Sequence, residues 1–281
     1  MSSSIAVMEL LLATGDSKAA ARCIEERAVS ERTNRYDELL QLLGDHRQGC
    51  DRAISIARRF DQAPAPVGTV ERVAFTKNRF DEAVGECEEA SVALYSLGDA
   101  NMLRAATDEV VRAMIGWEML GRDKDVLQIG CGIGRFEAAL SPHVRSAVGI
   151  DVSPKMIDAA RRRTAKLANV RCEVCSGLDL AGFEEDAFDL VYAVDSMPYI
   201  VEAGLELVAT HFREAARVLR RDGEFVICGF SYRGDLQRDR AEVGRLSSEY
   251  GFAVLFDGIS PYELWNGHVF RLRRQRDGVN G

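Results

Sequence analysis

Three glycines at alternate positions, followed by an acid at a fixed distance, form the pattern with the clearest chemical meaning in this sequence. The glycines are Gly130, Gly132 and Gly134, and Asp151 stands seventeen residues after the last of them. Glycine lacks a Cβ, so such a run lets the chain bend sharply and lets a ligand lie against bare backbone. A carboxylate can accept hydrogen bonds from both hydroxyls of a ribose. The spacing therefore predicts a pocket for a cofactor that contains a nucleoside.

Two short apolar runs must position this pattern. Residues 126–129 read Val-Leu-Gln-Ile, directly before Gly130, and residues 146–150 lead into Asp151. Runs of this length are typical of strands that are buried on both faces of a sheet. We therefore expect the glycines at the end of one strand and the acid at the tip of the next.

Two other glycine patterns are missing from this stretch. A dinucleotide-binding fingerprint requires its last glycine where this chain has Arg135, and a Walker phosphate loop requires Gly-Lys-Ser or Gly-Lys-Thr. The alternative for a lone glycine pattern is a tight turn in an ordinary α/β protein. The two flanking strands and the position of Asp151 favour the cofactor role.

From about residue 120 onward, strand-like and helix-like segments alternate. Such alternation predicts an α/β fold with a doubly wound, mostly parallel, seven-stranded sheet and helices on both faces. The last two strands have no helix between them, so we expect them to pair as an antiparallel hairpin. The expected strands are residues 126–129, 146–150, 170–174, 188–195, 224–230, 252–257 and 267–273.

Residues 1–63 form a predicted helical extension, and residues 64–281 form the predicted α/β domain. Within the extension, Glu9–Asp16 is echoed by Glu38–Asp45. In both copies a leucine-rich helix would stop at glycine, and the aspartate would cap the next helix. Two ordinary helical hairpins are one interpretation, and two short solenoid repeats are the other. Either way, the leucines must be buried against the α/β domain, a second copy of the chain or a protein partner.

Composition argues against several classes of function. The chain has 281 residues and a formal net charge of −8, which argues against a nucleic-acid partner held by phosphate contacts. No apolar run approaches the length of a membrane span. The seven scattered cysteines and the lack of a secretory leader favour a reducing cytoplasm. Because the cysteines and histidines are dispersed, no metal site is expected.

Several segments, in order, resemble the motifs of the class I S-adenosylmethionine-dependent methyltransferases. Residues 126–134 resemble the glycine motif of that family, 148–156 its second motif, 188–191 its fourth strand and 218–225 the turn before its fifth strand. The likeness covers about residues 120–273, just over half of the chain. It implies that S-adenosylmethionine is the cofactor and that a methyl group is transferred to oxygen or nitrogen of a small-molecule acceptor.

The resemblance also implies contacts for individual residues. The glycine segment should face the methionine part and the ribose, and Asp151 should hold the ribose hydroxyls. Residues after the second and third strands should lie against the adenine, and those ending the fourth strand should lie near the sulfonium or the acceptor. The expected cofactor contacts are Tyr95, Gln128, Gly130, Cys131, Gly132, Gly134, Asp151, Val152, Met156, Ser176, Gly177, Leu178, Val194 and Asp195.

Gln128 and Ser176 depart from the family, in which an acid is common at both positions. Glutamine still accepts a hydrogen bond but brings no charge, so each change could weaken cofactor binding by about 1 kcal/mol. Tyr95 precedes the helix that leads into the first strand, where a loop could fold over the cofactor. Its alternative is an ordinary buried tyrosine with a satisfied hydroxyl.

Methyl transfer from a sulfonium depends mainly on alignment of the acceptor, because the donor is already activated. A base is required only if the acceptor arrives protonated. Asp195 is the first catalytic candidate, since polar residues at the carboxyl ends of parallel strands line the ligand crevice. Tyr199 is the second, because Ser196-Met-Pro-Tyr199 is reminiscent of the Asn/Asp/Ser-Pro-Pro-Tyr signature of amine-methylating enzymes. The alternative for Tyr199 is a turn residue that packs the next helix.

Two other functions stay open. The helical extension, together with the departures at Gln128 and Ser176, also fits a cofactor-binding scaffold or regulatory protein without turnover. A further interpretation is a protein methyltransferase that uses residues 1–63 to select its target.

Overall fold

The computed structural model describes residues 2–30, 33–61 and 66–275, and the chain divides into two compact units. Helices α5 (Thr69–Glu86) and α7 (Ala100–Gly116) contribute residues to both units. The first unit comprises residues 1–64, 79–110 and 262–266, and the second comprises residues 65–78, 111–261 and 267–281.

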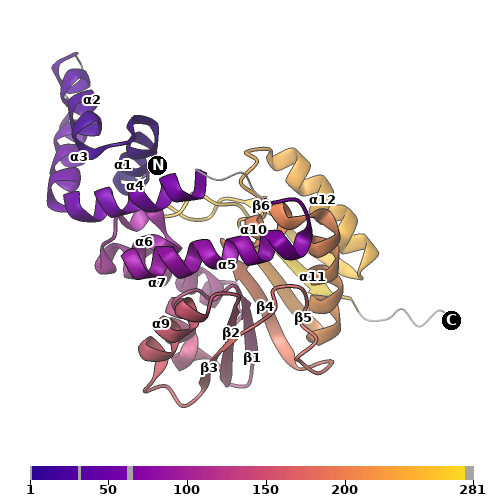
Figure 1. Cartoon of the computed structure of the whole chain (residues 1–281). Helices are drawn as coiled ribbons and strands as arrows, with labels where there is room; N and C mark the ends of the chain where they lie inside the picture. The colour runs from indigo at the N-terminus through magenta and orange to yellow at the C-terminus, as the bar shows by residue number, and fades with distance from the viewer. Residues whose placement is uncertain (1, 31–32, 62–65, 276–281) are drawn as a thin grey trace. The chain divides into compact units, whose positions relative to one another are not determined.

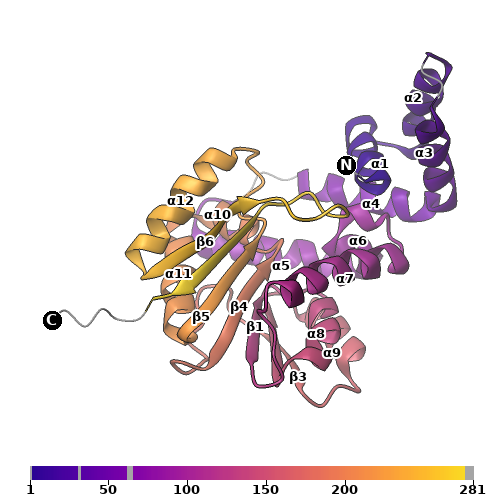
Figure 2. The ribbon, with the colours of Figure 1, turned by 180° about the vertical axis from the view of Figure 1, so that it is seen from behind.

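The second unit is built on a seven-stranded sheet (Figures 1 and 2). The strands lie in the order β3-β2-β1-β4-β5-β7-β6. Strands β1 to β5 pair in parallel, and β7 is antiparallel to both of its neighbours, so the predicted doubly wound sheet with a terminal hairpin is confirmed. The strands are β1 (Asp125–Ile129), β2 (Ser146–Asp151), β3 (Val170–Val174), β4 (Phe188–Val194), β5 (Leu219–Cys228), β6 (Phe252–Ile259) and β7 (Val269–Arg274).

Alternation along β1 shows that helices cover both faces of this sheet. Leu127 and Ile129 belong to the same hydrophobic cluster as Phe212 of α11. The amide of Gln128 lies against Glu137 of α8, on the opposite face. The helices of this unit are α8 (Arg135–Leu140), the short η2 (Ser141–His143), α9 (Pro154–Thr164), α10 (Met197–Ala203), α11 (Leu205–Val218) and α12 (Leu236–Glu249).

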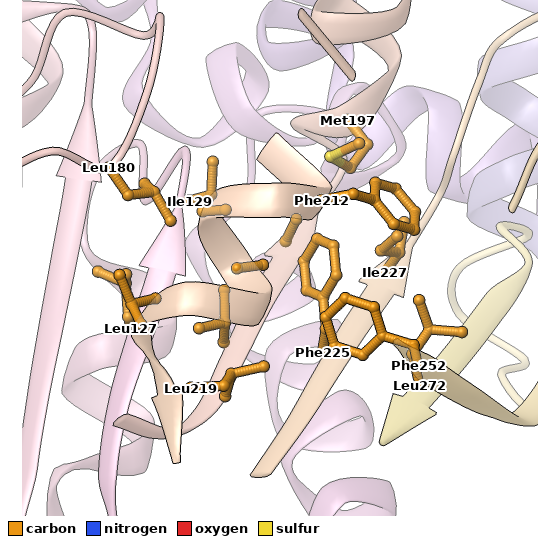
Figure 3. Packing of buried hydrophobic residues seen from close by; sticks show 14 of the residues in the cluster. Leu127, Ile129, Leu180, Met197, Phe212, Leu219, Phe225, Ile227, Phe252 and Leu272 are labelled. Atoms are coloured by element: carbon orange, nitrogen blue, oxygen red, sulfur yellow. The ribbon is translucent and has the colours of Figure 1, made fainter. Parts of the chain in front are cut away.

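The core on the α11 side of the sheet is aromatic (Figure 3). The ring of Phe212 meets that of Phe225 edge to face at 5.4 Å, and the Phe225 ring lies 6.2 Å from that of Phe252. All three side chains are buried, and burial of such a side chain stabilises a fold by roughly 1.5–3 kcal/mol. This packing fixes the strands whose carboxyl ends carry the candidate site.

Strand β5 begins earlier than expected. The turn predicted at residues 221–223 lies within the strand, where the register with β4 shifts between Phe188 and Leu190. Asp222 takes a left-handed conformation there, with φ of +62°. A local irregularity of this kind keeps strand pairing on both of its sides, so the Arg-Asp-Gly sequence bends β5 without ending it.

The first unit contains the predicted N-terminal helices, and the first of them ends as expected. Gly15 is left-handed with φ of +78°, and the Asp16 carboxylate accepts hydrogen bonds from two backbone N–H groups of the next helix. The second copy of the pattern differs: α3 continues through Gly44 and Asp45, so the predicted stop and cap at these two residues are wrong. The chain turns instead at His46, which leaves no need for a left-handed glycine. The elements are α1 (Ser3–Thr14), α2 (Ser17–Ser30), α3 (Asn34–Asp45), α4 (Arg47–Asp61), α6 (Glu88–Val92) and η1 (Leu94–Ser96).

The leucines of the N-terminal helices are not buried by residues 1–63 alone. Leu11 of α1 belongs to one hydrophobic cluster with Ala83 and Leu97, and both Leu11 and Leu97 are fully buried. The first unit therefore extends beyond the predicted helical extension. The predicted boundary between residues 63 and 64 lies outside the described residues.

Candidate functional site

The glycine loop, residues 130–134, follows β1 and turns the chain into α8. Gly130, Gly132 and Gly134 all adopt left-handed conformations, with φ of +72°, +52° and +71°. The N–H groups of Gly130 and Cys131 donate to the Ile150 carbonyl at 2.8 and 2.9 Å, which ties the loop to the end of β2. Side chains with a Cβ disfavour such angles. The backbone path itself therefore requires the alternate glycines.

Asp151 lies in direct contact with the glycine loop. The N–H of Gly132 donates to Asp151 Oδ2 at 2.9 Å, and the N–H of Ser153 donates to Asp151 Oδ1 at 2.9 Å. A carboxylate offers about four lone-pair sites, so it can accept hydrogen bonds from several donors at once. The side chain is also only partly buried. A direct hydrogen bond thus joins the glycine loop to the acid, although Gly132 and Asp151 are nineteen residues apart in the chain.

The turn after β4 closes one side of the glycine loop. Ser196 Oγ donates to the Ile129 carbonyl at 2.6 Å, and a Cβ on Gly130 would lie 2.3 Å from the Ser196 Cβ. The N–H of Asp195 donates to the Cys228 carbonyl at 2.9 Å, which ties the same turn to β5. This role of Ser196 was not predicted, because it depends on the approach of β4 to β1. The turn that carries Asp195 and leads into α10, the helix of Tyr199, is therefore fixed against the glycine loop.

The residues predicted to flank the adenine are only partly brought together. A Cβ on Gly177 would lie 2.4 Å from Cγ1 of Val152 and 3.0 Å from Cγ1 of Val73, so these three residues are in contact. Leu178 is partly buried, and Ser176 is exposed. Val73 belongs to α5 and was not predicted as a site residue, because its place depends on where that helix packs.

Gln128 and Met156 are each only 1% exposed. The Gln128 amide donates to Glu137 Oε1 at 2.7 Å and lies 3.2 Å from the Tyr192 hydroxyl. Burial raises the pKa of the Glu137 carboxyl well above its ordinary value. The polar group of Gln128 is therefore satisfied within the protein, and direct contact of Gln128 or Met156 with a cofactor stays a prediction.

Cys131 is buried, and its side chain faces the sheet. A Cβ on Gly149 would lie 2.7 Å from Cys131 Cβ and 2.9 Å from its Sγ. Burial also raises the pKa of the Cys131 thiol well above its ordinary value. The Cys131 side chain is thus packed within the protein, and contact of Cys131 with a cofactor stays a prediction.

Asp195 and Tyr199 lie at the carboxyl edge of the sheet, beyond the buried Val194 that ends β4. Asp195 has φ of +56°, an uncommon conformation for a residue other than glycine. The Tyr199 ring meets the Tyr232 ring edge to face, with centroids 5.7 Å apart. Tyr232 follows β5 and was not predicted, although the rule that selected Asp195, polar residues after parallel strands, applies to it equally.

Tyr95 belongs to the first unit, in the short helix η1, whereas all other predicted site residues belong to the second unit. Its side chain is partly buried. Its predicted contact with a cofactor stays a prediction.

Within the described residues, no group of three or more histidine, cysteine, aspartate and glutamate side chains is arranged to hold a metal ion. None of the helices in the described ranges is both long and apolar enough to cross a membrane. All seven cysteines are free thiols.

The sequence is similar to methyltransferases over its α/β part. A family model for a methyltransferase domain matches residues 127–227. The demethylmenaquinone methyltransferase of Tropheryma whipplei is 27% identical over 158 residues, which cover 56% of this chain and 59% of that protein. Nodulation protein S of Rhizobium tropici is 35% identical over 77 residues, which cover 27% of this chain and 31% of that protein. The chain thus spans less than two thirds of the length of either relative.

Solved structures share the fold. The magnesium protoporphyrin IX methyltransferase from Synechocystis PCC 6803 superposes with a TM-score of 0.55 at 15% identity, covering 76% of this chain and 100% of that chain. Phosphoethanolamine N-methyltransferase 1 of Haemonchus contortus gives a TM-score of 0.57 at 19% identity, covering 76% of this chain and 51% of that chain. The family model and the sequence relatives support assignment of this part of the chain to the class I S-adenosylmethionine-dependent methyltransferases, and the solved structures share its fold.

Proposed function

We propose that this chain transfers a methyl group from S-adenosylmethionine to an oxygen or nitrogen of a small-molecule acceptor. The observation that carries the proposal is the 2.9 Å hydrogen bond from the Gly132 N–H to the Asp151 carboxylate, at a loop of left-handed glycines. Bare backbone at the loop suits the methionine part of the cofactor. The carboxylate beside it suits the two hydroxyls of a ribose.

We assign roles to the other residues of the site from their positions around the glycine loop. Asp151 accepts hydrogen bonds from the ribose, and the backbone of residues 130–134 faces the methionine part. Val152 and Gly177 flank the adenine. Ser196 acts indirectly, because its bond to the Ile129 carbonyl holds the turn after β4 against the glycine loop.

S-Adenosylmethionine supplies an activated methyl group when it is bound. The task of the protein is then to align the acceptor atom with that methyl group and to exclude water. Asp195 accepts a proton from an acceptor that arrives protonated, and Tyr199 orients the acceptor. His211 does not serve as the base: it is 1% exposed, its Nδ1 lies 2.9 Å from the Leu207 carbonyl oxygen, and burial lowers its pKa.

Titration calorimetry with S-adenosylmethionine and S-adenosylhomocysteine tests the cofactor part of this proposal. We expect both ligands to bind, because they share the ribose and adenine. A folded protein that binds neither ligand would refute the proposal. A screen of small alcohols, phenols and amines for release of S-adenosylhomocysteine then tests the acceptor class.

A second candidate function is a cofactor-binding scaffold, and the separate core of the first unit favours it. A scaffold would bind S-adenosylhomocysteine yet release none with any acceptor. A protein methyltransferase would instead label a protein substrate in the presence of a radioactive methyl donor. Deletion of residues 1–63 is a poor test of either, because Leu11 shares its cluster with Ala83 and Leu97.

A further inference from the structure

Two tyrosine rings at the carboxyl edge of the sheet have no part in cofactor binding as proposed above. Tyr199 in α10 and Tyr232 after β5 meet edge to face, with centroids 5.7 Å apart and ring planes at 83°. Tyr232 nevertheless stays 57% exposed. An edge-to-face pair forms a corner, and an exposed aromatic face attracts a cation through its quadrupole.

The turn that carries Tyr232 is rigidly held. Ser231 Oγ donates to Asp239 Oδ1 at 2.8 Å, and the Arg233 guanidinium binds Asp239 at 2.7 Å and Glu242 at 2.8 Å. Asp239 is buried in α12. Both neighbours of Tyr232 are thus anchored to the same helix. These bonds hold the chain on both sides of Tyr232, while its own side chain is exposed.

The chain around Tyr199 is acidic. Residues 195–206 contain Asp195, Glu202 and Glu206 and no lysine or arginine. Arg72 of α5 donates to the carbonyl oxygen of Glu202, at the end of α10 away from Asp195. A corner of two aromatic rings beside an acidic segment favours a positively charged ligand over a neutral or anionic one.

We propose that Tyr199 and Tyr232 form a cation-binding corner that selects an amine, bound in its positively charged form, as the methyl acceptor. For transfer, the ammonium N–H proton passes to the Asp195 carboxylate, and the freed lone pair forms the new carbon–nitrogen bond. The methyl–sulfur bond breaks in the same step, and S-adenosylhomocysteine leaves with the electron pair. This inference rests on the proposed function and narrows its acceptor from oxygen or nitrogen to amine nitrogen. Tyr232 is a specificity-determining residue in this scheme: its ring contacts the substituents of the acceptor nitrogen.

Nuclear magnetic resonance of protein with labelled tyrosine rings tests the corner, using choline and 3,3-dimethylbutan-1-ol as probes. The two molecules have the same shape, and only choline is charged. In protein saturated with S-adenosylhomocysteine, we expect choline to shift the Tyr199 and Tyr232 ring signals and the alcohol to leave them in place. Equal shifts with both probes, or none with choline, overturn the proposal. Tyr250, which stands beside Glu249, serves as the internal control for non-specific attraction of cations.

Variants of Tyr232 give an independent test. Tyr232→Phe keeps the ring face, so choline should bind as it does to wild type. Tyr232→Leu removes the ring face and should weaken choline binding by about fivefold. Because Tyr232 is exposed, neither change should prevent folding, and equal choline affinity in the leucine variant would contradict the proposal.

The failure of this inference differs from the failure of the proposed function. Loss of S-adenosylhomocysteine binding in wild type would refute the methyltransferase proposal, and choline titration of the ligand-free protein would still decide whether the corner exists. Binding of S-adenosylhomocysteine without discrimination between the two probes would refute only the amine corner.

Discussion

The two halves of the carboxyl edge of the sheet are built in different ways. At β1 and β2 the proposed cofactor half consists of the glycine-loop backbone and the Asp151 carboxylate, which accepts a hydrogen bond from the Gly132 N–H. At β4 and β5 the proposed acceptor half consists of side chains that follow the strand ends: Asp195 and Tyr232 on turns and Tyr199 in α10. A backbone site tolerates few changes at its glycines, whereas a side-chain site can be altered one residue at a time. This difference fits the roles proposed for the two halves, which are cofactor binding at β1 and β2 and acceptor binding at β4 and β5.

Asp195→Asn should have the largest effect of the changes considered, and it should act on the proposed acceptor half. Asparagine tolerates the left-handed conformation at this position, so the variant should fold. If Asp195 accepts a proton from the acceptor, kcat should fall by about a hundredfold, while the affinity for S-adenosylhomocysteine stays within about twofold of wild type. If S-adenosylhomocysteine affinity and kcat fell by the same factor, Asp195 would instead belong to the cofactor half. Glu184→Gln, in an exposed loop, is the matched control.

Gly130→Ala should have the next largest effect, on the cofactor side. The new Cβ would lie 2.3 Å from the Ser196 Cβ, at a residue with φ of +72°. We expect S-adenosylhomocysteine affinity to fall by about thirtyfold or more, as measured by calorimetry. Gly244→Ala is the control, because a Cβ there has no neighbour within 4 Å. Unchanged affinity in Gly130→Ala would show that the glycine loop does not hold the cofactor.

Asp151→Ala should weaken cofactor binding by about tenfold to thirtyfold. The change removes the acceptor for the ribose and leaves the Gly132 N–H without its carboxylate partner. Because the ribose is common to both ligands, calorimetry should show the same fold-change for S-adenosylmethionine and S-adenosylhomocysteine. Asp158→Ala, at an exposed position on α9, controls for the loss of one negative charge. A loss confined to S-adenosylmethionine would contradict the ribose assignment.

Asp125→Asn should have the smallest effect, and on stability alone. Asp125 stands at the amino end of β1, where hydrogen bonds from Arg145 lower the pKa of its carboxyl. A carboxyl group whose pKa is lower in the folded state than in the unfolded state stabilises the fold at a pH above its unfolded pKa of about 3.9. This stabilisation is lost as the pH falls through the lower pKa of the folded state.

The Asp125→Asn variant should therefore be less stable than wild type at neutral pH, by about 1 kcal/mol or less because the pair is partly exposed. The difference should shrink as the pH falls below about 4. Urea unfolding at neutral and acidic pH measures both effects. A change in S-adenosylhomocysteine affinity would show that the two ends of β1 are not functionally separate.

Local patterns predicted the backbone of the glycine loop and the place of Asp151 well. The φ values of the three glycines and the position of Asp151 at the end of β2 follow from residue type and from near neighbours in the chain. Two predictions from local patterns were wrong, because neighbouring parts of the chain decided where the helix or strand ends. Gly44 stays helical because the chain turns at His46, and the sequence at residues 221–223 lies within β5.

Contacts between residues that are distant in the chain were less predictable, including those of the proposed acceptor half. Tyr232 meets Tyr199 because Val194 and Cys228 are in register on adjacent strands, and Val73 reaches Gly177 because α5 packs there. Gln128 was predicted as a cofactor contact from its motif position, yet its amide bonds to Glu137 within the protein. Residues that meet in the fold but lie far apart in the chain cannot be paired from the sequence near either one.

The sequence by itself determined the alternation of strands and helices, the left-handed glycine loop and the acid placed after the next strand. These features depend on steric preferences that act within a few residues. Only the tertiary structure decided that Asp151 binds the Gly132 N–H, that Ser196 lies against Gly130 and that two tyrosines share a corner. Such contacts follow from strand order and register, which depend on the packing of the whole sheet and not on any single segment.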